Sequence, residues 1–268
     1  MTSVLLNTKT YIPPVRSELV SRPQLIERLN AGLSGKLTLV SAPAGFGKTT
    51  LMSEWISQSE MPFCWISLDD NDNDPGRFLA YLVASFQSIK IEIDPEPIKL
   101  LQNPEKGQIE TILNDMINQI TDEQFQFALI LDDYHLIQNQ EVHQILAYLL
   151  EHLPPQVNIV LITRADPPLN IARLRARGQL NEFRAADLRF NISEGQQFLI
   201  QIADLDLDLS DIQKLVSRTD GWIAGLQLAS IALKGRQDPS DYIQHFSGSQ
   251  DYVFDFLTVE VLNQQPAY

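Results

Sequence analysis

The sequence predicts an α/β fold, in which helices cover both faces of a parallel sheet, followed by a smaller helical part. Two observations carry this prediction. Short apolar, β-branched runs alternate with amphipathic helical patterns along most of the chain, which is typical of βαβ units. After about Phe190 the strand-like runs stop, and the apolar spacing becomes helical.

Four strands are expected, because these apolar runs are too short to be buried helices. They are residues 36–40, 63–68, 127–131 and 157–163. A helix is expected to open at Pro23 behind a Ser21 cap. Further helices are expected over 49–57, 77–89, 109–120 and 142–153.

Three other segments are assigned from their local patterns. The stretch from Asn7 to Arg22 contains two prolines and is expected to be an extended lead-in. Residues 69–76 are polar and are expected to form a solvated loop. In the helical part, Ser193 and Ser210 each stand three residues before a glutamine, which is the spacing of a capping box.

Composition excludes several classes of function. The chain has 268 residues, with 20 Lys+Arg against 34 Asp+Glu and a net charge of −14, which argues against binding to a nucleic-acid backbone. Its one cysteine, Cys64, excludes an internal disulfide and favours a reducing compartment. No apolar run approaches the roughly 20 residues that span a bilayer, and the first residues are not a secretory signal. We therefore expect a cytoplasmic chain with no membrane partner.

The strongest motif is a glycine-rich loop between the first strand and the second helix. It runs Ser41-Ala42-Pro43-Ala44-Gly45-Phe46-Gly47-Lys48-Thr49-Thr50. In a phosphate-binding P-loop, G-x-x-x-x-G-K-[ST], backbone amides cradle a polyphosphate, the lysine adds a positive charge and the hydroxyl ligates magnesium. The helix dipole adds to this attraction. Ala42 replaces the opening glycine, and the alternative is an ordinary strand–turn–helix connection.

Two later strands end in residues suited to nucleotide chemistry. Asp132 and Asp133 follow an apolar strand, so their carboxylates are expected at the carboxyl edge of the sheet, where ligands bind in open α/β folds. Asp132 is the candidate magnesium ligand, and Asp133 could orient or deprotonate the attacking water. Arg164, at the end of the next strand, is a candidate sensor of a γ-phosphate, although a surface arginine is the alternative.

Other features have simpler explanations. Residues 70–74 imitate a calcium loop, but Pro75 and Tyr81 occupy positions that need glycine and glutamate. Trp222 is expected to be a core residue rather than a cofactor contact. A basic stretch is interpreted as a solvated helix face, with an arginine finger for a neighbouring subunit as the alternative. Its members are Arg173, Arg175, Arg177 and Arg184.

Taken together, an ordered set of segments resembles the MalT-like large ATP-binding LuxR regulators, which are STAND-class P-loop NTPases. The set comprises Leu6-Asn7-Thr8-Lys9 with Pro13-Pro14, Val20-Ser21-Arg22-Pro23, the glycine-rich loop, Trp65-Ile66-Ser67-Leu68-Asp69, Leu131-Asp132-Asp133-Tyr134-His135, Thr163-Arg164-Ala165-Asp166-Pro167-Pro168, Leu174-Arg175-Ala176-Arg177 and Asp220-Gly221-Trp222. The resemblance runs nearly end to end.

The resemblance implies a five-stranded P-loop NTPase core, a small helical lid and the start of a winged-helix domain. The implied domains are 1–35 (lead-in and first helix, adenine side), 36–190 (core), 191–248 (lid) and 249–268 (winged helix). It implies binding of ATP or ADP with Mg²⁺, slow hydrolysis, and self-association in the ATP state. Effector and DNA contacts would belong to later domains that this chain does not contain.

The resemblance also assigns site residues. Lys48, Asp133 and Arg164 take catalytic roles, and Thr49 and Asp132 hold the metal. Val20 and Arg22 lie on the adenine side. The remaining nucleotide contacts are Ala44, Gly45, Phe46, Gly47 and Thr50. Ile223 stands where related proteins often have a proline near the base, which puts lid contacts to adenine in doubt.

Two other functions remain open from the sequence. The altered loop start at Ala42 is compatible with a scaffold that binds nucleotide without hydrolysing it. A metabolic P-loop kinase is a third possibility, but the sequence shows no acceptor-binding pattern and the helical part is unexpected for one.

Overall fold

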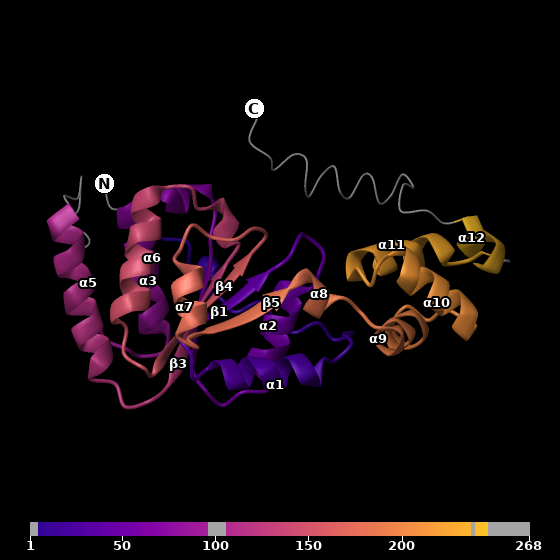
Figure 1. Ribbon diagram of the computed structural model, residues 1–268, viewed down its shortest axis with the longest axis horizontal. Helices are drawn as coiled ribbons and strands as arrows, with labels where there is room; N and C mark the ends of the chain where they lie inside the picture. Colours follow the sequence, from indigo (N-terminus) through magenta and orange to yellow (C-terminus); the bar gives the residue numbers. More distant parts are fainter. Residues whose placement is uncertain (1–4, 96–105, 237–238, 246–268) are drawn as a thin grey trace. The chain divides into compact units, whose positions relative to one another are not determined.

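The computed structural model describes residues 5–95, 106–236 and 239–245. The described residues form two compact units. The first contains 5–15, 23–41, 51–95 and 106–183, and the second contains 16–22, 42–50, 184–236 and 239–245. The expected domain at 249–268 lies outside the described residues. Figure 1 labels the elements along the chain.

The first unit is built on a five-stranded sheet with the order β2-β3-β4-β1-β5. The strands are β1 (Leu37–Ser41), β2 (Phe63–Ser67), β3 (Phe127–Asp132), β4 (Val157–Thr163) and β5 (Leu180–Arg184). The pairs β2–β3, β3–β4 and β1–β4 are parallel. The four strands expected from apolar runs are confirmed, as is the total of five that the family resemblance implies.

β5 was not predicted from the apolar runs because its sequence mixes apolar, polar and charged residues. Its residues read Leu-Asn-Glu-Phe-Arg, and only Phe183 is buried. It lies at the end of the sheet order, where one edge has no neighbouring strand. A half-exposed edge strand does not need the continuous apolar run of a central strand.

Helices surround the sheet in the first unit (Figure 1). They are α1 (Pro23–Gly32), α2 (Lys48–Ser57, in the first unit from Leu51), α3 (Pro75–Ser88), α5 (Lys106–Thr121), α6 (Gln140–His152) and α7 (Ile171–Ala176). The first five occupy the segments in which the apolar spacing predicted helices. β1, β3 and β4 are buried along their whole length, so successive residues must pack on opposite faces of the sheet.

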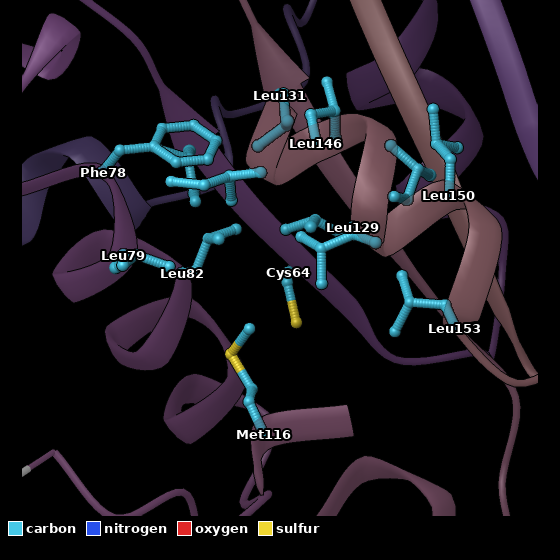
Figure 2. Packing of buried hydrophobic residues seen from close by; sticks show 14 of the residues in the cluster. Cys64, Phe78, Leu79, Leu82, Met116, Leu129, Leu131, Leu146, Leu150 and Leu153 are labelled. Atoms are coloured by element: carbon cyan, nitrogen blue, oxygen red, sulfur yellow. The ribbon is translucent and has the colours of Figure 1, made fainter. Parts of the chain in front are cut away.

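Figure 2 shows the larger hydrophobic core of this unit. Cys64, Leu129 and Leu131 project from β2 and β3 toward side chains of α3, α5 and α6. The helical side chains in view are Phe78, Leu79, Leu82, Met116, Leu146 and Leu150, with Leu153 just after α6. Burial raises the pKa of the Cys64 thiol, so this cysteine is an inert core residue.

Residues 69–76 are only in part the solvated loop that their polarity predicted. Asp70, Asn71 and Asp74 are exposed, but a short 3₁₀ turn, η2 (Asp70–Asn73), leads through Asp74 into α3. Asp72 is fully buried and pairs with Lys9 and, at 3.2 Å, with Arg77 Nε. Burial would raise the pKa of Asp69, but hydrogen bonds from Lys9 and Asn71 outweigh it and hold that pKa below its ordinary value.

The lead-in was expected to be extended, but it contains a 3₁₀ turn, η1 (Asn7–Thr10). Lys9 belongs to this turn and is buried. Its ammonium pairs with Asp72, lies 3.1 Å from Asp69 Oδ2 and stacks 4.7 Å from the centre of the Tyr81 ring. Charge pairing therefore attaches η1 to η2, and Arg77 of α3 shares the same Asp72 carboxylate.

The second unit contains a helical cluster. Its elements are α8 (Ala185–Leu188), α9 (Ile192–Gln196), the π-helix η4 (Gln197–Ile202), α10 (Leu209–Arg218), α11 (Ile223–Leu233) and α12 (Pro239–His245). A small core holds them together, formed by Leu199, Ile212, Leu215, Val216, Leu226, Ala229, Leu233 and Ile243.

The helix caps in this unit differ from the serine caps expected. Asn191 caps α9, and its carboxamide and the Glu194 carboxylate form the reciprocal capping box. Asp208 caps α10 by accepting from the Asp211 amide. Each helix begins one residue before its serine, because Asn191 or Asp208, two residues before that serine, offers an equally good acceptor.

Candidate nucleotide site

The glycine-rich loop occupies residues 42–47, between β1 and α2, and belongs to the second unit. Gly45 and Gly47 have φ values of 77° and 73°, in the left-handed region that glycine adopts without strain. Ala42 is not among the described residues with positive φ. The alanine that replaces the opening glycine therefore causes no backbone strain.

Lys48 is the first residue of α2, and its ammonium is held inside the loop. Nζ donates to the carbonyl oxygens of Ala42 at 2.7 Å and Pro43 at 2.9 Å, and the residue is 8% exposed. A buried ammonium at the start of a helix is a favourable place for a polyphosphate, because the charge and the helix dipole act together. Thr49 and Thr50 follow in the first turn and are half-buried.

Trp222 contacts this loop. Its indole Nε1 donates to the Ala44 carbonyl at 2.9 Å, and the Ala224 amide donates to the Gly45 carbonyl at 3.1 Å. Trp222 also packs against the helical core, so the interpretation as a core residue was incomplete. Apart from the family resemblance of the Gly-Trp pair, nothing in the local pattern of the sequence signalled the contact with the loop.

Asp132, Asp133 and Arg164 lie in the first unit, at the carboxyl edge of its sheet. Asp132 ends β3 opposite Ser67 of β2, and it is 5% exposed. Its Oδ1 accepts from the Asp133 amide at 2.9 Å. Thr163 ends β4 opposite Ser41 of β1, and Arg164 follows it, half-buried. The parallel register thus brings the predicted acids and arginine to one edge.

Asp133 has an unusual backbone for a residue with a side chain. Its φ of 56° and ψ of 36° place it in the left-handed region, which aspartate tolerates better than most residues. This turn ends β3 and leaves the side chain 47% exposed, with Oδ1 3.8 Å from Nδ1 of His135. The buried Asp132 carboxylate and the exposed Asp133 carboxylate therefore have different environments.

Val20 and Arg22, expected on the adenine side, belong to the second unit. Val20 is buried. Arg22 pairs with Glu194 at 2.9 Å and donates to the carbonyl oxygens of Leu188 and Arg189. Its guanidinium also stacks 5.1 Å from the centre of the Phe190 ring. The Arg22 side chain thus donates hydrogen bonds to the carbonyl groups at the end of α8 and links the lead-in segment to α9.

The basic stretch divides between two elements. Arg173 and Arg175 lie on α7 and pair with Glu151 and Glu182 at 3.0 and 2.8 Å. Arg184 instead ends β5, so the stretch is not a single helix face. In the described part of the chain, no group of three His, Cys, Asp or Glu side chains could hold a metal by itself, and no helix could cross a membrane.

No protein-family model matches the chain. It is 33% identical over 266 residues to the HTH-type transcriptional regulator MalT of Yersinia enterocolitica, and 32% identical over 266 residues to MalT of Yersinia pestis. The chain is a homologue of the MalT regulators. Both alignments cover 97% of this chain but 29% of the relative, so the chain spans less than a third of the length of those relatives.

Two solved structures share the fold. A Signal Transduction ATPase with Numerous Domains (STAND) protein with a tetratricopeptide repeat sensor, from Pyrococcus horikoshii, gives a TM-score of 0.61 at 17% identity, over 87% of this chain and 33% of that chain. A Walker-type ATPase of Pyrococcus abyssi gives 0.56 at 16% identity, over 88% and 74%. The predicted class, a parallel-sheet P-loop NTPase core followed by a small helical part, is confirmed.

Proposed function

We propose that this chain is the nucleotide-controlled switch module of a MalT-like transcriptional regulator. It binds ATP or ADP with Mg²⁺, hydrolyses ATP slowly and self-associates when ATP is bound. The observation that carries the proposal is the loop with two left-handed glycines, closed by Lys48 at the start of α2. Its ammonium lies against the loop's own carbonyls, where a phosphate could take their place.

The residues proposed as magnesium ligands have suitable chemistry. Thr49 and Asp132 supply hydroxyl and carboxylate oxygens, the ligands that Mg²⁺ prefers. When bound, Mg²⁺ neutralises charge on the phosphates and orients them. Lys48 binds the phosphates, Asp133 orients or deprotonates the attacking water, and Arg164 responds to the γ-phosphate.

The remaining loop positions contribute to binding. The backbone from Ala44 through Gly45, Phe46 and Gly47 to Thr50 surrounds the phosphates. Val20 and Arg22 lie on the adenine side. Because the Arg22 guanidinium is used by Glu194 and the end of α8, we propose that this segment contributes its backbone and the Val20 side chain to the base.

Switching follows from the difference between ATP and ADP. Only contacts that distinguish the two nucleotides can shift a conformational equilibrium, and the γ-phosphate contacts of Lys48 and Arg164 are such contacts. A shift from 1:99 to 99:1 needs about 5.5 kcal/mol of differential binding. One phosphate is not expected to supply this alone, so an effector or self-association must add to it.

Contacts with effector and DNA are assigned to parts of the regulator beyond this chain. The relatives named MalT are HTH-type regulators about three times as long as the aligned region. The net charge of −14 supports this assignment, since a DNA-binding surface needs clustered positive charge.

Binding is tested by calorimetry with ATP and ADP in the presence of Mg²⁺. Lys48→Ala is expected to abolish measurable binding, while Lys234→Ala, which removes an exposed lysine at the end of α11, is expected to bind like the wild type. Unchanged affinity in Lys48→Ala would remove the central assignment.

Turnover and self-association need separate assays. A single-turnover experiment with γ-labelled ATP is expected to show slow phosphate release, and sedimentation velocity is expected to show larger species with a non-hydrolysable ATP analogue than with ADP. Binding without any phosphate release would favour the non-hydrolysing scaffold instead.

A further inference from the structure

We propose that Trp222 is a positioning residue for the phosphate loop: with the Ala224 amide, it holds two loop carbonyls outward and so keeps the neighbouring amides turned toward the nucleotide. The inference rests on the proposed function, because it assigns a control element to the same loop. It concerns groups within the second unit only.

The contact between the loop and the start of α11 is close. In addition to the two hydrogen bonds to Ala44 and Gly45, a Cβ placed on Gly45 would lie 2.6 Å from both Trp222 Nε1 and Ala224 Cβ. At Gly47 the same test meets only a methyl carbon of Ile223, at 3.7 Å. Gly45 therefore needs to be glycine for two reasons, its left-handed φ and this contact.

The planarity of the peptide group turns these contacts into control of the loop amides. In a trans peptide the C=O of one residue and the N–H of the next point in opposite directions. When Trp222 holds the Ala44 carbonyl, the Gly45 N–H points to the opposite side. When Ala224 holds the Gly45 carbonyl, the Phe46 N–H does the same. Two successive peptide planes are thus fixed from α11, with a left-handed glycine between them, as in an anion-binding nest.

Trp222 connects the loop to the first residue of α11 through its side chain and its place in the chain. Trp222 is the N-cap residue of α11, and its side chain makes no capping hydrogen bond. Behind it, Leu226, Ala229 and Leu233 anchor α11 in the helical core. A phosphate that binds the loop amides polarises the same peptide groups whose carbonyls bind α11, and so strengthens those bonds. Occupancy of the loop is thereby coupled to the helical cluster.

The test compares Trp222→Phe with the wild type. Phenylalanine keeps an aromatic ring against the core but has no N–H donor, so calorimetry with Mg²⁺ is expected to give about fivefold weaker binding of both ATP and ADP, the factor for one hydrogen bond of about 1 kcal/mol. Phe198→Leu is the matched control: it alters the packing of the same helical core without removing a loop contact, and its affinity is expected to match the wild type.

A second variant separates the hydrogen bond from packing. Replacement of Trp222 by β-(3-benzothienyl)alanine, introduced by amber suppression, retains the shape of the indole and lacks only the N–H. It is expected to show the same fivefold loss with an unchanged melting temperature. Tryptophan emission supplies an independent readout: nucleotide is expected to change it in the wild type but not in Trp222→Phe, because Trp55 and Trp65 are buried in the first unit.

The outcomes separate the two proposals. If the wild type binds nucleotide and both Trp222 variants bind with wild-type affinity, the positioning role is overturned and the proposed function stands. If the wild type itself binds no nucleotide while its fold is intact by circular dichroism, the proposed function fails, and the positioning role fails with it.

Discussion

Replacing Asp72 by asparagine tests the buried charge cluster that attaches the N-terminal turn to α3. The carboxylate is fully buried and faces two cations, Lys9 and Arg77, which are themselves 8% and 19% exposed. Removing one partner of a buried ion pair costs about 3–5 kcal/mol, because the other charge remains in a poorly hydrated place. Lys9 would retain Asp69, 3.1 Å away and partly exposed, so we expect the lower end of this range.

Urea unfolding followed by circular dichroism measures the effect. Asp72→Asn is expected to lower the free energy of unfolding by about 3 kcal/mol, equivalent to roughly 6–12 °C in melting temperature for a domain of this size. Asp70→Asn changes an exposed carboxylate in the same turn and is the matched control, expected to stay within about 0.5 kcal/mol of the wild type.

Adding Lys9→Met to the Asp72→Asn variant completes the test. The combined loss should be smaller than the sum of the two single losses, because the second change removes the unpaired charge that the first one creates. A loss below about 1 kcal/mol for Asp72→Asn, or strict additivity of the two changes, would refute the reasoning.

Two further predictions concern residues near the end of β3. His143 is buried, with Nδ1 2.8 Å from the Tyr134 hydroxyl, and burial lowers its pKa. In the unfolded chain the His143 imidazole takes up a proton near pH 6.5, whereas in the folded chain it does so only at lower pH. The contribution of His143 to the free energy of unfolding is therefore complete above that pH and is lost as the pH falls below it. His143→Gln should flatten this part of a plot of unfolding free energy against pH, and an unchanged slope would contradict the assignment. Asp133→Asn should keep the left-handed backbone and bind ATP normally but slow hydrolysis by about 100-fold or more; wild-type single-turnover rates would exclude Asp133 as the group that acts on water.

The local pattern of the sequence was sufficient where burial is continuous. β3 and β4 are enclosed on both faces, so nearly all of their residues are apolar, the exceptions being Asp132, Asn158 and Thr163. Such a run is visible without knowledge of the neighbouring strands. The glycine-rich loop was also visible in the local sequence, because Gly45 and Gly47 can adopt their left-handed φ values without strain. The strand ends then located Asp132 and Arg164 at the sheet edge.

Only the tertiary structure decided how polar residues are used. The buried state of Asp72 depends on Lys9, more than 60 positions earlier in the chain, and the contact of Trp222 with Ala44 joins residues nearly 180 positions apart. β5 is defined by its place beside β1 and not by its composition. In each case the deciding partner is distant in sequence. A charged group or an N–H group that is buried away from water needs a partner, and the local sequence does not show which distant residue provides it.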